Sequence, residues 1–276
     1  MKTFLHTGCA LISIWLLLQV SACKKENTTL YPIPANLKMI TSGYAMGAAT
    51  KVEVYAANDL FIGYNIIHIA LYDSVSNMRI TQAQISLNAL MKTGSGTSQS
   101  GPVENPTSTQ AVNGLFNAAV VFTKPTASNS NWALSMQVQN QGNQKTGSFA
   151  GTVSVVQPSP AKAYSLIAKD DSASLFVCLL QPATPQLGAN SFEVTIYRQI
   201  SPMNFAPDSS YNVMIDAEMP SMSGMNSPNY VNPVYTGNGH YLGKVDFIMS
   251  GEWQINMSLL HNTALADSSH YFDLSL

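Results

Sequence analysis

Three methionines, Met219, Met222 and Met225, occur within seven consecutive residues of this sequence. The proline, serine and glycine residues among them predict a loop that leaves a sheet and lies near solvent. Methionine normally fills gaps in protein cores, so a cluster in an exposed loop suggests another role. Thioether sulfurs are soft, neutral donors that select Cu(I) over Zn²⁺, Mg²⁺ or Ca²⁺. The stretch therefore predicts a site for cuprous copper.

His240 is the residue that can complete such a site. It follows an Asn-Gly pair and opens the next predicted strand. If that strand lies beside the methionine loop, its imidazole becomes a fourth ligand. Glu218 is a further oxygen donor, although a salt bridge or solvation is the commoner role for such a residue. The competing interpretation is structural: the methionines cover the end of a sandwich and His240 caps a turn.

Other kinds of chemistry have little support in the sequence. No GxSxG nucleophile motif and no glycine-rich phosphate loop occurs. The acidic pair Asp170 and Asp171 lacks the further oxygen ligands of a Ca²⁺ shell, and Cys178 lies in an apolar run typical of a core strand. His261 and His270 flank a predicted hairpin connection and could face each other across it. We expect a protein without enzymatic activity.

Composition restricts the fold and the partners. Of the 276 residues 46% are hydrophobic and 10% are charged, against roughly 25% charged in ordinary globular proteins. A net charge of −2 argues against a nucleic-acid binder, which needs a basic face. Many uncharged polar residues with few charges suit alternating β-strands better than helices, whose exposed faces usually carry Glu and Lys.

Short segments with strand-like patterns recur throughout the chain. Residues 132–138 and 253–259 alternate between apolar and mostly small or polar residues, the period of a half-buried antiparallel strand. Six such strands per roughly 110 residues predict an all-β protein of two tandem immunoglobulin-like sandwiches. The predicted strands are 50–57, 64–72, 83–89, 115–123, 132–139 and 148–156, then 175–180, 191–198, 211–218, 241–249, 253–260 and 271–276.

Three motifs occur twice in the same order and predict a tandem repeat. A Gly-x-Asn motif at 63–65 recurs at 188–190, an Asn-Pro pair at 105–106 recurs at 232–233, and Trp132 recurs as Trp253. We therefore expect a diverged first domain at 44–157 and a second at 163–276, with the boundary near the prolines of 157–163.

The first residues are typical of an export signal. A lysine precedes a mostly apolar stretch at 4–20, and small residues lead to Cys23. The stretch is almost long enough for a transmembrane anchor, the competing interpretation. Residues 20–23 resemble a bacterial lipobox, which implies that 1–22 are removed, Cys23 is lipidated, and 23–43 form a tether. The charged residues after Cys23 resemble a surface-export signal, so we expect an outer-membrane lipoprotein facing the periplasm or the cell surface.

The segment from Tyr211 to Leu260 resembles the YtkA-like (FixH-related) domain, in the form found in lipoproteins of Bacteroidota. The resemblance is carried by residues 218–222, 227–234 and 236–245. It implies a small β-sandwich associated with copper or with accessory proteins of respiratory oxidases, and ligand roles for Met219, Met222 and His240. Met225 and Tyr235 stand where the family pattern has histidines. The thioether of Met225 makes the site softer and favours Cu(I), whereas Tyr235 removes one ligand. The corresponding stretch of the first copy, 88–101, has one methionine and no histidine or cysteine.

The sequence therefore supports two hypotheses about function. In the first, the chain is a membrane-anchored, non-enzymatic lipoprotein whose second domain binds Cu(I) through Met219, Met222, Met225 and His240. In the second, it is a metal-free interaction or adhesion module whose low-charge surface contacts glycans or proteins. Its partners in either case are the membrane, reached through the lipid anchor, and a protein complex of the envelope.

Overall fold

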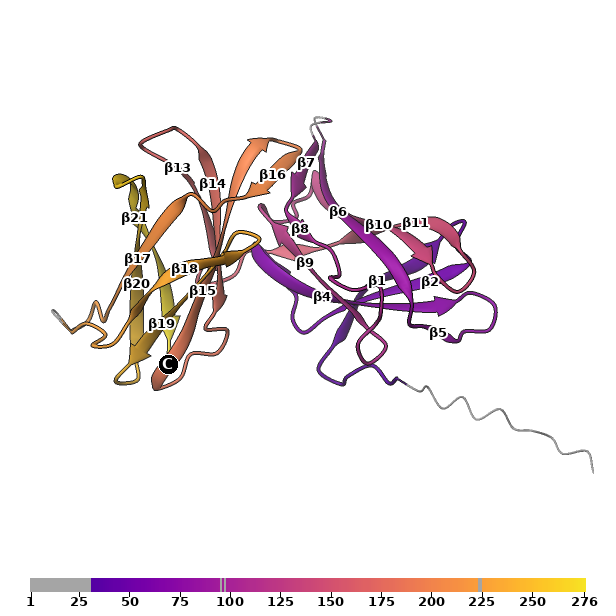
Figure 1. The fold of residues 1–276 in the computed structure, drawn as a ribbon, viewed down its shortest axis with the longest axis horizontal. Coiled ribbons are helices and arrows are strands. Elements are labelled where there is room, and N and C mark those ends of the chain that lie inside the picture. The colour runs from indigo at the N-terminus through magenta and orange to yellow at the C-terminus, as the bar shows by residue number, and fades with distance from the viewer. Residues whose placement is uncertain (1–30, 95, 97, 223–224) are drawn as a thin grey trace, which may run out of the picture. The chain divides into compact units, whose positions relative to one another are not determined.

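The computed structural model describes residues 31–94, 96, 98–222 and 225–276. The predicted signal peptide and Cys23 lie outside the described residues. Tyr31–Leu276 form one compact unit built of strands (Figure 1). The described part of the chain contains no apolar helix of membrane-spanning length. The all-β, sandwich-type fold predicted from the sequence is confirmed.

Strands β1–β12 form the first sandwich. One sheet has the order β1 (Lys38–Ala45), β2 (Thr50–Ala56), β4 (Gly63–Asp73), β9 (Phe116–Phe122) and β8 (Val103–Glu104). Strand β5 (Arg79–Ile80) pairs with β4 beside this order. The other sheet has the order β11 (Lys145–Val153), β10 (Ser130–Asn140), β6 (Ala83–Thr93) and β7 (Ser98–Gly101). A short parallel pair joins β3 (Leu60–Phe61) to β12 (Val155–Val156).

Strands β13–β21 form the second sandwich. One sheet has the order β13 (Ala163–Ile167), β14 (Ser174–Gln181), β15 (Gly188–Ser201), β19 (His240–Phe247) and β18 (Val231–Gly237). Strand β16 (Asn204–Pro207) pairs with β15 beside this order. The other sheet has the order β17 (Tyr211–Glu218), β20 (Glu252–His261) and β21 (Ala264–Ser275).

The central strands β10 and β20 show why this sequence forms sandwiches. Successive side chains of a strand point to opposite faces. In β10, Trp132, Leu134 and the two apolar residues that follow at the same spacing are buried, while most of the residues between them are more exposed. In β20, Trp253 and Ile255 begin the same pattern. Each tryptophan meets a phenylalanine of the opposite sheet, which anchors one core per sandwich.

The motifs that occur twice in the sequence make the same contacts in the two sandwiches. The Asn65 side chain bonds to the backbone of residues 61 and 63, and the Asn190 side chain bonds to residues 186 and 188 in the same way. The Asn105 oxygen accepts from the Leu87 amide of β6, and the Asn232 oxygen accepts from the Ile215 amide of β17. In both sandwiches an asparagine thus fastens an edge segment to the facing sheet.

The N-terminal boundary of the first sandwich differs from the prediction. Strand β1 begins at Lys38, inside the segment assigned to the tether, and pairs with β2. Tyr31 is also held, because its carbonyl accepts a hydrogen bond from Arg79. Strand β1 has no clear pattern because it is an edge strand and is largely exposed, so its side chains need not alternate between apolar and polar.

The two sandwiches pack directly against each other. Phe176, Cys178 and Tyr197, which belong to strands of the second sandwich, are buried in the same hydrophobic cluster as the core of the first. Cys178 is fully buried, in agreement with its interpretation as a core residue rather than a reactive thiol. The linker passes close to Gly63, where a Cβ atom would lie 3.4 Å from the carbonyl oxygen of Lys162.

Candidate functional site

The methionine loop does not present three sulfurs to solvent. Met219 is 4% exposed and belongs to the second core, with its methyl group against Gly251. Met222 is 41% exposed, and Met225 is half-buried against the same core. Backbone hydrogen bonds of 2.9–3.0 Å link the three residues to one another in a closed turn. The loop thus places its three methionines in three different environments, of which one is solvent.

His240 lies at the other end of strand β19 from this loop. His240 opens the strand, whereas Ser227 of the methionine loop donates a 2.8 Å hydrogen bond to the carbonyl of Asp246 near the strand's end. Six residues separate the two points, so at about 3.3 Å per residue they are about 20 Å apart. The expected four-ligand cluster of three methionines and His240 is not assembled. Sequence spacing could not reveal this, because it does not say which end of β19 the loop approaches.

The His240 imidazole instead lies between two carboxylates. Its Nε2 is 2.9 Å from Oε1 of Glu104 in β8, and its Nδ1 is 2.7 Å from Oε1 of Glu193 in β15. Hydrogen bonds to Glu104 and Glu193 raise the pKa of His240 from 6.5 to about 9, despite the opposing effect of burial. The ring is therefore protonated at neutral pH, and both nitrogens donate. An imidazolium has no lone pair for a metal ion.

Glu104 is the centre of this polar network and belongs to the first sandwich. Besides His240, it accepts hydrogen bonds from the hydroxyls of Tyr64, at 2.9 Å, and Tyr197, at 3.0 Å. Burial by itself would raise the pKa of Glu104, but the His240 imidazolium and the two hydroxyls hold that pKa below its ordinary value. Residues from both sandwiches thus bond to one half-buried carboxylate, which fixes the sandwiches against each other.

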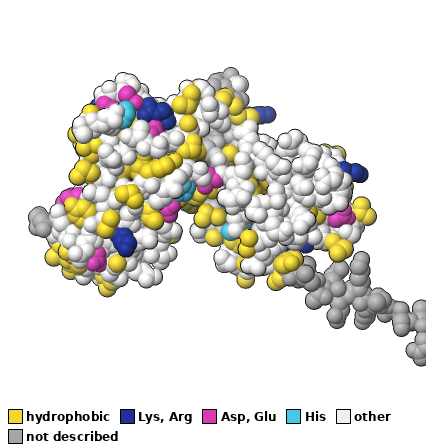
Figure 2. All heavy atoms as spheres, viewed as in Figure 1, with side chains coloured by type: hydrophobic (Ala, Val, Ile, Leu, Met, Phe, Trp, Pro, Cys, Tyr) yellow, Lys and Arg dark blue, Asp and Glu magenta, His cyan; other side chains and the backbone are white. Residues whose placement is uncertain are grey.

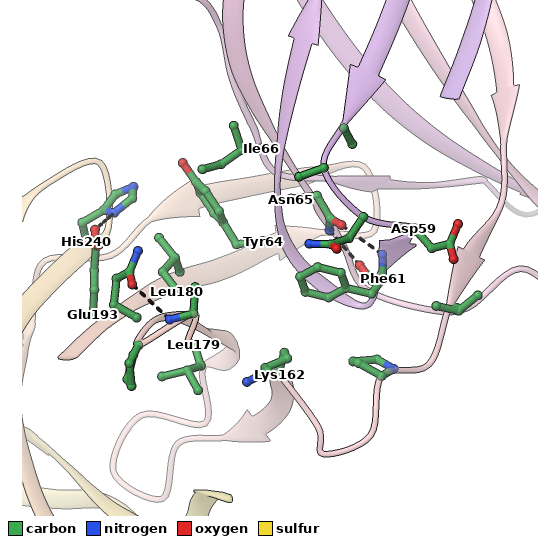
Figure 3. A pocket seen from close by; sticks show the side chains of 18 of the residues that line it. Asp59, Phe61, Tyr64, Asn65, Ile66, Lys162, Leu179, Leu180, Glu193 and His240 are labelled. Atoms are coloured by element: carbon green, nitrogen blue, oxygen red, sulfur yellow. Dashed lines mark hydrogen bonds and ion pairs between the residues drawn. The ribbon is translucent and has the colours of Figure 1, made fainter. Parts of the chain in front are cut away.

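A cavity of about 760 Å³ opens beside the network at the junction of the sandwiches (Figure 3). More than half of its lining residues are apolar. Both sandwiches contribute, the first mainly through β3 and β4 and the second through β14 and the residues around it. The lining includes Phe61, Tyr64, Lys162, Leu179, Leu180 and His240.

Lys162 differs from the other charged groups of the cavity because it has no charged partner. Lys38 forms an ion pair with Asp59, and Glu193 is bonded to His240. Among the described residues, no carboxylate pairs with the Lys162 ammonium group. Burial lowers the pKa of Lys162, and no neighbouring charge contributes to that shift.

The structure brings together one group of potential metal ligands that the sequence did not identify as a set. Asp170, Asp171 and His261 offer atoms within 4.8 Å of one another. Asp170 is bonded to His261 at 2.6 Å, and Asp171 is paired with Arg198 at 2.8 Å. The guanidinium group of Arg198 therefore already supplies a positive charge to Asp171. His270, by contrast, bonds to Asp267 at 2.9 Å instead of facing His261.

Several residues of the junction were not identified from the sequence. Glu104, Glu193 and Lys162 are single charged residues in segments of ordinary appearance. Glu104 alone had a signal, because it precedes the Asn-Pro pair of the repeated motif, yet that motif pointed to the fold and not to a site. His240 was singled out as a metal ligand, but its partners are carboxylates from segments distant in the sequence.

Comparison with known proteins assigns part of the second sandwich to a family. Residues 170–258 match the family described as YtkA-like, so the resemblance to this domain is confirmed for that segment. The segment includes the methionine loop and His240 but not Glu104. The sequence matches none of the curated proteins with which it was compared.

Three solved structures show distant similarity to the chain. They are the adhesin FdeC of Escherichia coli (15% identity, TM-score 0.28), a DUF4785 family protein of Legionella pneumophila (13%, 0.27) and the adhesin InvE of Yersinia pseudotuberculosis (13%, 0.25). The alignments cover 84%, 83% and 87% of this chain and 65%, 56% and 58% of those proteins, so the chain spans less than two thirds of their length. At these identities and TM-scores the similarities say nothing about function.

Proposed function

We propose that this chain is a non-enzymatic binding module of the cell envelope, anchored through Cys23, that recognises a small ligand in the cavity between its sandwiches. Ligand pockets occur preferentially at domain junctions and are mostly apolar with a few polar groups. The cavity has these features and, at about 760 Å³, the size of a typical small-molecule site.

The observation that carries the proposal is the hydrogen-bonded network around Glu104. It connects the first sandwich to His240 and Tyr197 of the second directly beside the cavity. Walls that are fixed before binding lower the entropic cost of ordering a site. The histidine and the carboxylates that could act in acid–base catalysis are bonded to one another in this network. This arrangement supports binding rather than catalysis.

The surface is consistent with a binding role. On the face shown in Figure 2, charged side chains are scattered, and uncharged polar groups and backbone cover most of the area. Exposed hydrophobic residues of the second sandwich include Val231, Val234, Tyr235 and Leu242 on the neighbouring strands β18 and β19. A surface of this kind suits contact with a further envelope protein, the partner expected from the sequence.

Copper binding is the second candidate function. It is supported by the YtkA-like segment and by the i, i+3 spacing of Met222 and Met225, the more exposed methionines of the loop. Met219 is buried and His240 is protonated and distant, so two thioethers remain as donors. We therefore propose the metal-free binding function ahead of copper binding.

A neutral dye tests the proposed function without assuming the charge of the ligand. Nile red should gain fluorescence when it enters an apolar cavity of the purified full chain. Ala57 is exposed and lines the cavity, so Ala57→Trp should fill the space and reduce the fluorescence. Val75 is 91% exposed and does not line the cavity, which makes Val75→Trp the matched control. Equal fluorescence for the two variants would overturn the proposal.

A further inference from the structure

We propose that the junction cavity binds an organic anion whose negative group pairs with Lys162 and whose apolar body contacts Phe61, Leu179 and Leu180. This inference rests on the proposed function and adds the chemical class of the ligand. It follows from the charges inside the cavity, from the way Lys162 is held there, and from the nature of the remaining walls.

Among the described residues, one cation of the cavity lining has no ion-pair partner. Five lining residues carry charge at neutral pH. Lys38 and Asp59 pair with each other, and the protonated His240 is bonded to Glu193 and to Glu104, which lies outside the lining. Lys162 remains, half-buried and without an acidic neighbour among the described residues. A buried charge is costly unless it is paired, so an anionic ligand would supply the missing partner.

The backbone at Lys162 is held next to both sandwiches, and its side chain lines the cavity. The Lys162 carbonyl accepts a 2.9 Å hydrogen bond from the Leu179 amide. On the other side it lies close to Gly63, where a Cβ atom would be 3.4 Å from this oxygen. Figure 3 shows the side chain between Leu179 of the second sandwich and Phe61 of the first. Its ammonium group is thus presented to the space that a ligand would occupy.

The remaining walls favour an apolar body over a polyhydroxylated one. Phe61, Ile66, Leu179 and Leu180 present hydrocarbon to the cavity. The amide of Asn65, which also lines the cavity, makes three hydrogen bonds to the backbone of its own turn. A sugar would need several free polar groups, whereas an amphiphilic carboxylate needs one cation and an apolar surface.

Calorimetric titration of the purified full chain with three matched pairs of probes tests the inference. The pairs are hexanoate and hexanol, phenylbutyrate and phenylbutanol, and decanoate and decanol. A charge-assisted contact with Lys162 should make at least one carboxylate bind about tenfold more tightly than its alcohol at neutral pH. Lys162→Gln should abolish this preference and Lys162→Arg should retain it. Lys38→Gln, which changes a cavity lysine that already has a partner, should leave the preference intact.

The outcomes separate this inference from the proposed function. If carboxylates and alcohols bind equally and both are lost in Ala57→Trp, the cavity binds ligands but the anionic class is wrong. A preference for the carboxylate that survives in Lys162→Gln also overturns the role of Lys162. If Ala57→Trp changes the binding of none of the six probes, both the inference and the proposed function fail.

Discussion

The Nε2 atom of His240 in the second sandwich lies 2.9 Å from the Oε1 atom of Glu104 in the first. The two residues are 136 positions apart in the sequence and belong to different sandwiches. Through this contact His240, which was expected to bind copper, forms part of the junction between the sandwiches. The stability of the protein should therefore depend on the charge of this histidine.

The pKa of His240 makes a prediction about alkaline pH. Because that pKa rises from 6.5 to about 9 on folding, the stabilisation is complete below pH 6.5 and is lost as the pH rises through about 9. We expect the free energy of unfolding to fall by on the order of 2 kcal/mol between about pH 6 and about pH 10 from this group. Urea unfolding of the wild type and of His240→Gln measures the effect. An equal loss in the variant would assign it to other groups.

Replacement of Glu104 should destabilise the protein more than the loss of an ordinary surface carboxylate. Glu104→Ala removes the common acceptor of His240, Tyr64 and Tyr197 and leaves a partly buried imidazolium with a single partner. We expect a loss of about 3 kcal/mol in unfolding free energy. Glu252 is exposed at the start of β20, and Glu252→Ala should change stability by less than about 0.5 kcal/mol. Similar values for the two variants would contradict the central role of Glu104.

The methionine loop should respond unequally to truncation. Met219 is 4% exposed and packs into the second core, so Met219→Ala should cost about 2 to 5 kcal/mol by leaving a cavity. Met222 is 41% exposed, and Met222→Ala should change stability by less than about 0.5 kcal/mol. Thermal and urea unfolding provide both values. Equal, small effects would show that Met219 is not a core residue and would return it to the list of potential ligands.

Competition for Cu(I) against a chelating probe tests the ligand set directly. Because His240 is protonated, bonded to two carboxylates and at the other end of β19 from the loop, His240→Gln should leave the Cu(I) affinity unchanged. Met219→Leu, which preserves the core, should also leave it unchanged. If the protein binds Cu(I), the double variant Met222→Leu/Met225→Leu should lose that binding. A loss of affinity in His240→Gln would restore the imidazole to the metal site.

The strands were predictable because their patterns are local. Strand β17 has the predicted limits, Tyr211–Glu218, and β10 and β20 show the alternation expected from their residues. The missed strands are β1, β3, β5, β7, β8, β13, β16 and β18. All but β1 and β18 are short, and all lie at sheet edges or beside the main order of strands, where exposed side chains need not alternate.

The sequence alone was sufficient for the all-β class, the alternating core strands and the burial of Cys178. These properties depend on neighbours along the chain, so residue type and spacing report them. The partners of His240, the isolation of the Lys162 charge and the separation of His240 from the methionine loop were decided by tertiary structure. Each depends on which strand ends meet when one sandwich packs on the other, and periodic patterns within a strand carry no information about that contact.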